Sequence, residues 1–452
     1  MTEQGRLIRV LRRREVLALA FGAMIGWSWV ALAGTWLESA GSLGAITAFL
    51  IGGAVIAFIG LTYAELASAM PLVGGEHTYS LRALGPGASF VCTWAIIFGY
   101  VSVVAFEVVA LPTVLEYLFP TLKKGYLWTV AGYDVYFSWV LVGVAGSLVM
   151  TAVNVVGIKM AAVVQTAVTL VILLAGLVVV SGALFNGSAA NMQPLEVGGI
   201  NGMLTVLVMV PFLLVGFDVI PQAAEEIDLP YREIGAVLVI SVIMAVAWYV
   251  LIVLGVSLSL DNIELGRASL ATADAGTAAW SRPLIGKLVV VAGIAGILTS
   301  WNAFLVGGSR AIYALAHGGM LPRFLGRLHP RFNTPANAVV LVGVLAVFAP
   351  LFGRRTLVWL VDAGGFGIVV AYAMVALSFI VLRRKEPEMP RPYRVRYGSF
   401  VGYTALFLSL GMMVLYLPGS PSALVWPHEW MILLTGVVVG GVFYVWARVT
   451  RG

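Results

Sequence analysis

Twelve apolar runs of about 20 residues recur along the chain, with short polar segments between them. A run of this length crosses the roughly 30 Å hydrocarbon core of a bilayer as an α-helix, so each run predicts one transmembrane helix. The runs occupy residues 16–37, 44–69, 87–112, 135–157, 160–185, 201–224, 234–260, 286–315, 336–353, 357–382, 400–418 and 429–448. The pattern predicts an all-α integral membrane protein with twelve transmembrane helices and both termini on one side.

Two of these runs contain residues that weaken a helix at its middle. Residues 22–30 read GAMIGWSWV in the first run, and Gly216-Phe217-Asp218 lies between Pro211 and Pro221 in the sixth. A glycine inside a helix costs about 1 kcal/mol relative to alanine. One explanation is helix packing through small residues; the other is a non-helical turn that faces a cavity. Because two runs share the feature, we expect both helices to be broken.

The positions of the interrupted runs indicate an internal repeat. Five helices separate the first run from the sixth, and an odd offset makes the second unit enter the membrane from the opposite face, as in an inverted repeat. The predicted organisation is a tail at 1–15, five-helix repeats at 16–185 and 200–382, a basic loop at 383–399 and helices eleven and twelve at 400–448. In this design the broken helices meet at the bilayer midplane, where substrate binds.

Composition and charge placement agree with a membrane protein. Hydrophobic residues make up 61% of the 452 residues and charged residues 11%, with a mean hydropathy of +0.99, whereas soluble proteins carry about 25% charged residues. Of the 27 lysines and arginines, twenty fall on the side of the termini and seven on the other. This bias predicts cytoplasmic termini in a plasma membrane protein, with the bilayer and no nucleic acid as partner. Lys123-Lys124 and Arg354-Arg355 are exceptions.

The basic clusters indicate how the chain is oriented in the membrane, and the single cysteine excludes some kinds of site. Arg12 to Arg14 and the 383–396 cluster are expected to fix topology and meet anionic headgroups. Cys92 is the one cysteine, which excludes an internal disulfide and a cysteine-based metal site. We expect no metal and no cofactor.

Three motifs, in order along the chain, resemble the amino acid/polyamine/organocation (APC) permease superfamily. They are 63–66 (YAEL) with 71–85 (PLVGGEHTYSLRALG), in which His77 replaces the usual tyrosine; 216–218 (GFD) with 224–226 (AEE) and 230–232 (PYR); and Asn302, 309–310 (SR), 313–316 (YALA) and 319–322 (GMLP). The resemblance covers about residues 15–397. It implies a leucine-transporter-type fold, a five-plus-five inverted repeat with helices one and six broken, and secondary transport of an amino acid or amine by alternating access.

The breaks and the resemblance together indicate a substrate site. Its predicted residues are Met24, Ile25, Gly26, Trp27, Ser28, Trp29, Gly216, Phe217 and Asp218. Gly26 and Ser28 fall where the family carries a Gly-Ser/Ala-Gly turn, whose backbone N–H groups receive the substrate carboxylate. Here Trp27 replaces the small residue and Ser28 the later glycine. Trp27 can narrow the site, stack on a substrate or face away, so an amino acid and an amine without a carboxylate are both open.

Three acidic residues lie within apolar runs. An isolated charge at the bilayer centre costs about 2.5–3.5 kcal/mol even on the lenient insertion scale, so Glu107, Asp218 and Asp362 are candidates for function. We expect them to converge on one cavity, where they would suit an ammonium-bearing substrate or a proton relay. The alternatives are a structural carboxyl for Glu107 and an exposed position at the outer helix end for Asp362.

The resemblance also indicates gates and a coupling site. Phe217 lies where the family tends to place an aromatic gate, and Glu225 and Glu226 either pair with nearby arginines or close an inner gate. A lysine of helix five that replaces sodium in some relatives is absent, since Ile172 stands near its place. The candidates for ion coupling are Thr299, Ser300 and Asn302. Proton symport, sodium symport and facilitated exchange all remain open.

Other classes of function fit the sequence less well. Polar rings or filter sequences that would indicate a channel are not found. His77, His317, His329 and His428 all stand at or near segment ends, which argues against an enzyme built on a histidine cluster. A permease for an amino acid or related amine is the main interpretation. A polyamine or organic-amine transporter or exchanger that uses the three carboxyls, and a transporter-like nutrient sensor, are the alternatives; the oligomeric state is not predicted.

Overall fold

Each predicted apolar run is helical in the computed structural model, which describes residues 9–449 and, of residues 158–164, the backbone alone. Residues 1–8 of the predicted tail lie outside the described residues. Nine described helices are long and apolar enough to cross a membrane. Eight of them each hold one predicted run: α5 (Pro86–Leu118), α6 (Phe137–Val156), α7 (Ile158–Asn186), α10 (Tyr231–Ser259), α13 (Pro283–His317), α15 (Thr356–Lys385), α16 (Gly398–Leu415) and α17 (His428–Val449).

The first two runs differ from the prediction in their boundaries. The first run forms α1 (Arg13–Met24), α2 (Ser28–Ala31) and the start of α3 (Ala33–Ala69), which continues through the second run. A loop was expected at 38–43, but the chain turns at Gly41 alone, with φ of +73°. A Cβ atom on Gly41 would lie 2.7 Å from the Leu195 carbonyl oxygen. Glycine therefore allows a sharp bend without a loop.

The sixth and ninth runs form shorter helices. The sixth consists of α8 (Gly199–Leu213), α9 (Val219–Gln222) and the 3₁₀ turn η3 (Ala224–Glu226). The ninth consists of α14 (Ala336–Ala346) and η5 (Ala349–Phe352). Because these segments are short or interrupted, the exact number of twelve spans stays a prediction.

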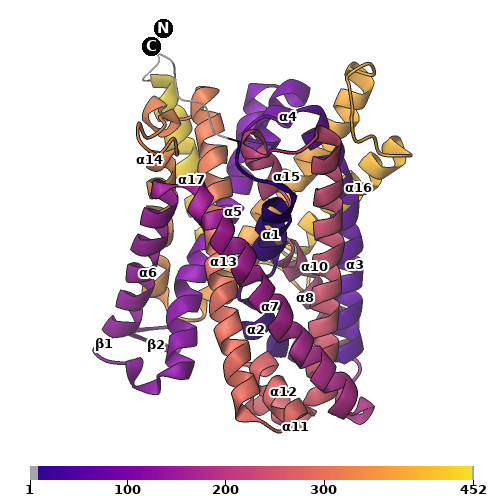
Figure 1. Ribbon diagram of the computed structural model, residues 1–452, viewed down its shortest axis with the longest axis vertical. Helices are drawn as coiled ribbons and strands as arrows, with labels where there is room; N and C mark the ends of the chain where they lie inside the picture. The colour runs from indigo at the N-terminus through magenta and orange to yellow at the C-terminus, as the bar shows by residue number, and fades with distance from the viewer. Residues whose placement is uncertain (1–8, 450–452) are drawn as a thin grey trace.

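Short elements outside the runs cap the two ends of the bundle. They are α4 (Glu76–Leu84), η1 (Pro120–Leu122), β1 (Tyr126–Val130), β2 (Tyr133–Tyr136), η2 (Ala189–Met192), α11 (Asn262–Arg267), α12 (Ala271–Trp280) and η4 (Arg323–Gly326). Strands β1 and β2 form an antiparallel hairpin in which Val130 pairs with Tyr133. Figure 1 shows α4 at one end of the bundle and β1, β2, α11 and α12 at the other.

Helix α3 packs along α8 and α10, while α5 packs along α13 and α15. Small residues permit the close approach: a Cβ on Gly52 would lie 2.6 Å from Val210 Cγ1, and one on Gly99 would lie 2.4 Å from Ile368 Cγ1. Glycine at helix contacts is typical of membrane bundles, where backbones must approach closely to gain dispersion contacts. Helix α17, by contrast, has only three buried residues, Glu429, Gly440 and Ala447, as a peripheral helix would.

The basic loop after α15 has a structural role that was not predicted. Arg383 Nε donates to Glu65 Oε1 at 2.9 Å, Arg391 Nε lies 3.0 Å from the same oxygen, and the Val395 N–H donates to Glu65 Oε2 at 2.8 Å. Glu65 on α3 is fully buried. Arg383, in the last turn of α15, and Arg391, in the loop after it, therefore compensate a buried carboxylate in addition to any contact with headgroups.

Candidate functional site

The first break lies between the end of α1 at Met24 and the start of α2 at Ser28. Tyr249 of α10 holds its two sides together, because its hydroxyl donates to the Met24 carbonyl oxygen at 2.8 Å and lies 2.7 Å from the Ser28 hydroxyl. Thr272 of α12 donates to the Trp29 carbonyl oxygen at 2.6 Å. Side chains thus replace helix hydrogen bonds that the break removes, as non-helical backbone within a membrane requires.

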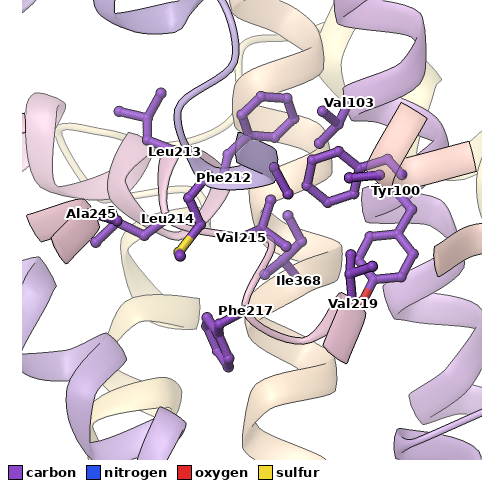
Figure 2. Packing of buried hydrophobic residues seen from close by; sticks show 14 of the residues in the cluster. Tyr100, Val103, Phe212, Leu213, Leu214, Val215, Phe217, Val219, Ala245 and Ile368 are labelled. Carbon is purple, nitrogen blue, oxygen red and sulfur yellow. The ribbon is translucent and has the colours of Figure 1, made fainter. Parts of the chain in front are cut away.

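The second break separates α8 from α9, and Gly216 has a φ of +138° there. The Gly216 N–H donates to Asp218 Oδ1 at 2.9 Å, and the Tyr372 hydroxyl of α15 donates to Asp218 Oδ2 at 3.2 Å. Figure 2 shows the non-helical chain from Leu214 to Phe217, with Tyr100 nearby. Asp218 therefore stabilises the turn that contains it.

The two breaks are in direct contact. A Cβ on Gly216 would lie 2.7 Å from Ala23 Cβ and 2.9 Å from the Met24 backbone nitrogen. Beside this contact is a cavity of about 10 Å³, which is close to the volume that one water molecule requires. The cavity is lined by Ala23, Met24, Gly26, Ser28, Val103, Phe106, Glu107, Phe212, Leu213, Ser300 and Phe304. The space between the breaks, α5 and α13 is therefore almost closed in this structure.

The cavity contains part of the predicted first-break site, namely Met24, Gly26 and Ser28. Ile25 and the two tryptophans are fully buried and do not line it. Trp27 packs on α13 so closely that a Cβ on Gly293 would lie 2.1 Å from its ring, and Trp29 meets Trp248 edge-on at 5.3 Å between ring centroids. Of the three roles considered for Trp27, the structure shows the one in which it faces away.

The aromatic residues that line the cavity do not include Phe217, the predicted gate. Phe217 lies 5.3 Å from Tyr63 and 5.5 Å from Tyr372 between ring centroids, and it does not line the cavity. Phe212, one turn before the second break, lines it together with Phe106 and Phe304. Figure 2 shows Phe212 and Phe217 on opposite sides of the broken segment. The signal available in the sequence was Pro211, which marks the end of α8 beside Phe212.

Glu107 of α5 lies beside the first break. Its carboxyl interacts with Ser300 and with the Trp27 backbone, and a Cβ on Gly26 would lie 2.5 Å from Glu107 Oε1. Glu107 Oε2 has no hydrogen-bond partner in the described part of the chain. A carboxyl of the protein therefore already lies beside the backbone of this turn.

The three predicted carboxyls do not converge on one cavity, contrary to the expectation above. Asp362 interacts with Glu429 of α17, whereas Asp218 binds Tyr372. Asp362 and Tyr372 are ten residues apart on α15, or about 15 Å along a helix that rises 1.5 Å per residue. Asp362 and Asp218 therefore lie at different levels of the bundle, and of the three carboxyls Glu107 alone lines the cavity between the breaks.

The ion-coupling candidates tie helices together. The Thr299 hydroxyl donates to the Gly22 and Gly296 carbonyl oxygens at 3.1 and 3.0 Å, a bonding mode common for threonine in helices. Asn302 Nδ2 donates to Gln165 Oε1 of α7 at 3.3 Å. Three oxygens meet at Thr299, which is a partial set of ligands for a cation. The described residues contain no group of three or more histidine, cysteine, aspartate or glutamate side chains that could hold a metal ion.

Gln165 was missed by the sequence reasoning. Its Nε2 donates to the Ala18 and Thr299 carbonyl oxygens, each at 3.3 Å, and so it joins α1, α7 and α13. It is buried, with 2% of its surface exposed. A polar residue in the apolar run 160–185 was the available signal.

The two gate candidates, Glu225 and Glu226, form hydrogen bonds at the end of the second broken helix. Arg310 Nε of α13 donates to Glu226 Oε1 at 2.8 Å, and both side chains are buried. The Leu11 N–H donates to the Glu226 carbonyl oxygen at 3.0 Å, and the Val73 N–H donates to Glu225 Oε1 at 3.2 Å. The expected pairing with an arginine is present for Glu226, whereas Glu225 binds a backbone group.

His77, which stands where the family carries tyrosine, provides a pH-dependent contribution to stability. Burial lowers its pKa from 6.5 to about 4. The folded protein takes up this proton less readily than the unfolded chain, so the stabilisation is complete above about pH 6.5 and is lost as pH falls towards 4. We expect the melting temperature to fall less between about pH 7 and about pH 5 in His77→Gln than in the unmodified protein. The exposed His317→Gln is the control, and equal pH dependence in His77→Gln would contradict the assignment.

Comparison with known proteins supplies the family context. The sequence model of a family described as amino acid permease matches residues 11–443. A methylthioribose transporter of Bacillus subtilis is 25% identical over 97% of this chain and 93% of its own length. A branched-chain amino acid permease of the same organism is 25% identical over 86% and 84%, and its aspartate-proton symporter is 24% identical over 89% and 78%. These relatives are all transporters.

Proposed function

Because the chain belongs to the amino acid permease family, we propose that it moves a small amino acid or a related solute across the plasma membrane by alternating access. It is a multi-pass membrane transporter and not an enzyme. The proposal includes cytoplasmic termini and an inverted repeat in which α1–α2 and α8–α9 are the equivalent broken helices.

The observation that carries the proposal is the contact between the two breaks. Gly216 touches Ala23 and Met24, and the adjoining cavity of about 10 Å³ is too small for a solute. Alternating access requires such a closed state, from which the two broken helices separate towards one side or the other. The hydrogen bonds at Tyr249 and Asp218 would hold this closed, solute-free state.

The cavity favours a small solute with an apolar part and a hydrogen-bond donor. Met24, Phe106 and Phe212 supply the apolar wall, while Ser28 and Glu107 supply acceptors. A solute with a net negative charge would be repelled by Glu107 unless one of the interacting carboxylates were protonated. We therefore propose a neutral solute, such as a branched-chain amino acid or a thiosugar, ahead of an acidic one. A polyamine stays an alternative, although it would meet one carboxyl here instead of three.

A counterflow experiment in proteoliposomes tests this function. Vesicles containing the purified full-length protein and unlabelled leucine, methylthioribose, aspartate or putrescine are diluted into the same labelled solute. We expect saturable accumulation with leucine or methylthioribose, because neither solute carries a net negative charge, whereas aspartate does. A Gly26→Val variant, whose side chain would fill the space beside Glu107 Oε1, is the matched negative control. Binding in a thermal-shift assay without counterflow would instead indicate a sensor.

A further inference from the structure

Two buried carboxyl groups interact on the α4 side of the second break. Glu76 is the first residue of α4, Asp218 precedes α9, and neither side chain has exposed surface. Gln222, which is bound to Glu76, follows Asp218 by about one helical turn, so the two carboxyls lie close enough to repel each other. Neither lines the cavity described above. They form a second polar centre, which the proposed function does not use.

Residues on both sides of the break hold these carboxyls. Asp218 accepts the Gly216 N–H at 2.9 Å, whereas Gln222 Nε2, at the end of α9, donates to Glu76 Oε2. The Gly74 N–H donates to the Gln222 carbonyl oxygen at 3.4 Å. The segment that leads into α4 is therefore fixed directly against α9.

The surroundings contain no positive charge to balance the pair. The titratable groups that face it are Tyr63 of α3, His77 and Tyr79 of α4, Cys92 and Tyr100 of α5, and Tyr372 of α15. His77 is neutral near pH 7, because burial lowers its pKa to about 4. Within the described side chains, no lysine or arginine forms an ion pair with Glu76 or Asp218. Two uncompensated charges at buried positions are strongly unfavourable, so at least one carboxyl carries a proton.

Unsatisfied polar atoms beside the pair offer a place for that proton. Glu76 Oε1, Gln222 Oε1 and the Tyr79 hydroxyl are buried without a hydrogen-bond partner in the described part of the chain. A proton on Glu76 Oε1 turns an orphaned acceptor into a donor, with acceptors nearby. None of the cavities described in the structure is lined by Glu76 or Asp218, so no site for a larger cation is evident there.

We propose that the pair Glu76 and Asp218 holds one proton, on one carboxyl or the other, and that this proton latches α4 against the second break and keeps that side of the transporter closed. When the proton passes to water, two adjacent negative charges remain and push α4 away from α9. The proposal rests on the proposed function and deepens it, because it identifies a proton as the ion that controls one step of the cycle.

The native Cys92 is a reporter for this movement. It is fully buried on α5 and lies within electrostatic reach of Glu76. We expect maleimide to label it in the purified full-length protein faster at about pH 9 than at about pH 6. At the higher pH we expect labelling of Glu76→Gln to be about tenfold slower than that of the unmodified protein, the change that one pKa unit of coupling gives. Asp218→Asn should behave likewise, since it also removes one charge and keeps an acceptor for the Gly216 N–H.

Because the variants and the unmodified protein are compared at one pH, the effect of pH on the ionisation of the thiol itself does not enter the comparison. Glu388→Gln, which neutralises an exposed carboxyl, is the matched control and should label like the unmodified protein. Equal labelling rates in Glu76→Gln, Asp218→Asn and the unmodified protein would overturn the proposal. Because no solute is needed, this result is independent of the counterflow experiment: failure of counterflow would reject the proposed function, whereas equal labelling would reject the latch alone.

Discussion

Gly216→Ala is expected to reduce transport at least tenfold, with a loss of about 1–3 kcal/mol from backbone strain alone. The residue has a φ of +138°, a conformation that an L side chain rarely adopts. Its new methyl group would also lie 2.7 Å from Ala23 Cβ and 2.9 Å from the Met24 nitrogen. The two breaks would have to separate to accommodate it. Counterflow and thermal unfolding of the same preparation measure the two effects.

The matched control is Gly411→Ala in α16. A Cβ there meets nothing within 4 Å, and the residue has no unusual φ. Alanine in an open helix position stabilises a helix by roughly 0.5–1 kcal/mol relative to glycine. Transport should therefore be unchanged and the melting temperature slightly higher. If Gly216→Ala transports as Gly411→Ala does, close contact of the breaks is not needed for function.

The helix breaks could be predicted because their signal is local. Glycine and proline act on the backbone of their own segment, so 22–30 and 211–221 indicate interruptions without knowledge of the partners. The turn between the first two runs was predicted at 38–43, but its sharpness was not, since the chain turns at Gly41 alone. A single glycine with a positive φ suffices there, so the chain needs no loop.

The direction of each side chain could not be predicted, since it depends on rotation of the broken segments. Phe217 was chosen for its position inside the break, yet it packs on Tyr63 and Tyr372, while Phe212 lines the cavity. Asp362 and Asp218 have the same chemistry, but the rise of α15 separates them. A sequence shows which residues are costly to bury, whereas their height and their partners follow from packing between distant elements.

Glu76 could not be recognised as a buried charge from the sequence, for a different reason. It stands in the motif 71–85, outside the apolar runs, so it was not considered a buried charge. The structure packs α4 on the second break and buries Glu76 completely. Burial there raises the pKa of Glu76 well above its usual value, with a further contribution from Asp218. A loop helix that folds back over the bundle thus converts a polar motif into part of the interior.

Arg310→Met is expected to destabilise the protein by about 3–5 kcal/mol, because it leaves the buried Glu226 carboxylate without its partner. Arg310 Nε and Nη2 donate to the two Glu226 oxygens at 2.8 and 3.2 Å, a bidentate pair with almost no exposure. The same pair joins α13 to the end of the second broken helix. We therefore expect lower thermal stability together with faster labelling of Cys92, since the end of the bundle at α4 would open.

The double variant Arg310→Met/Glu226→Met separates charge from packing. Replacing both partners of a buried pair by apolar residues is often neutral or stabilising, so most of the lost stability should return. Arg82→Met is the exposed control: the Arg82–Glu386 pair has side-chain exposures of 49% and 32%, and such pairs contribute about 0–1 kcal/mol. If the double variant is as unstable as Arg310→Met, the cost comes from lost packing around the guanidinium. If it is stable but labels Cys92 rapidly, the ion pair closes this end of the transporter without being needed for the fold.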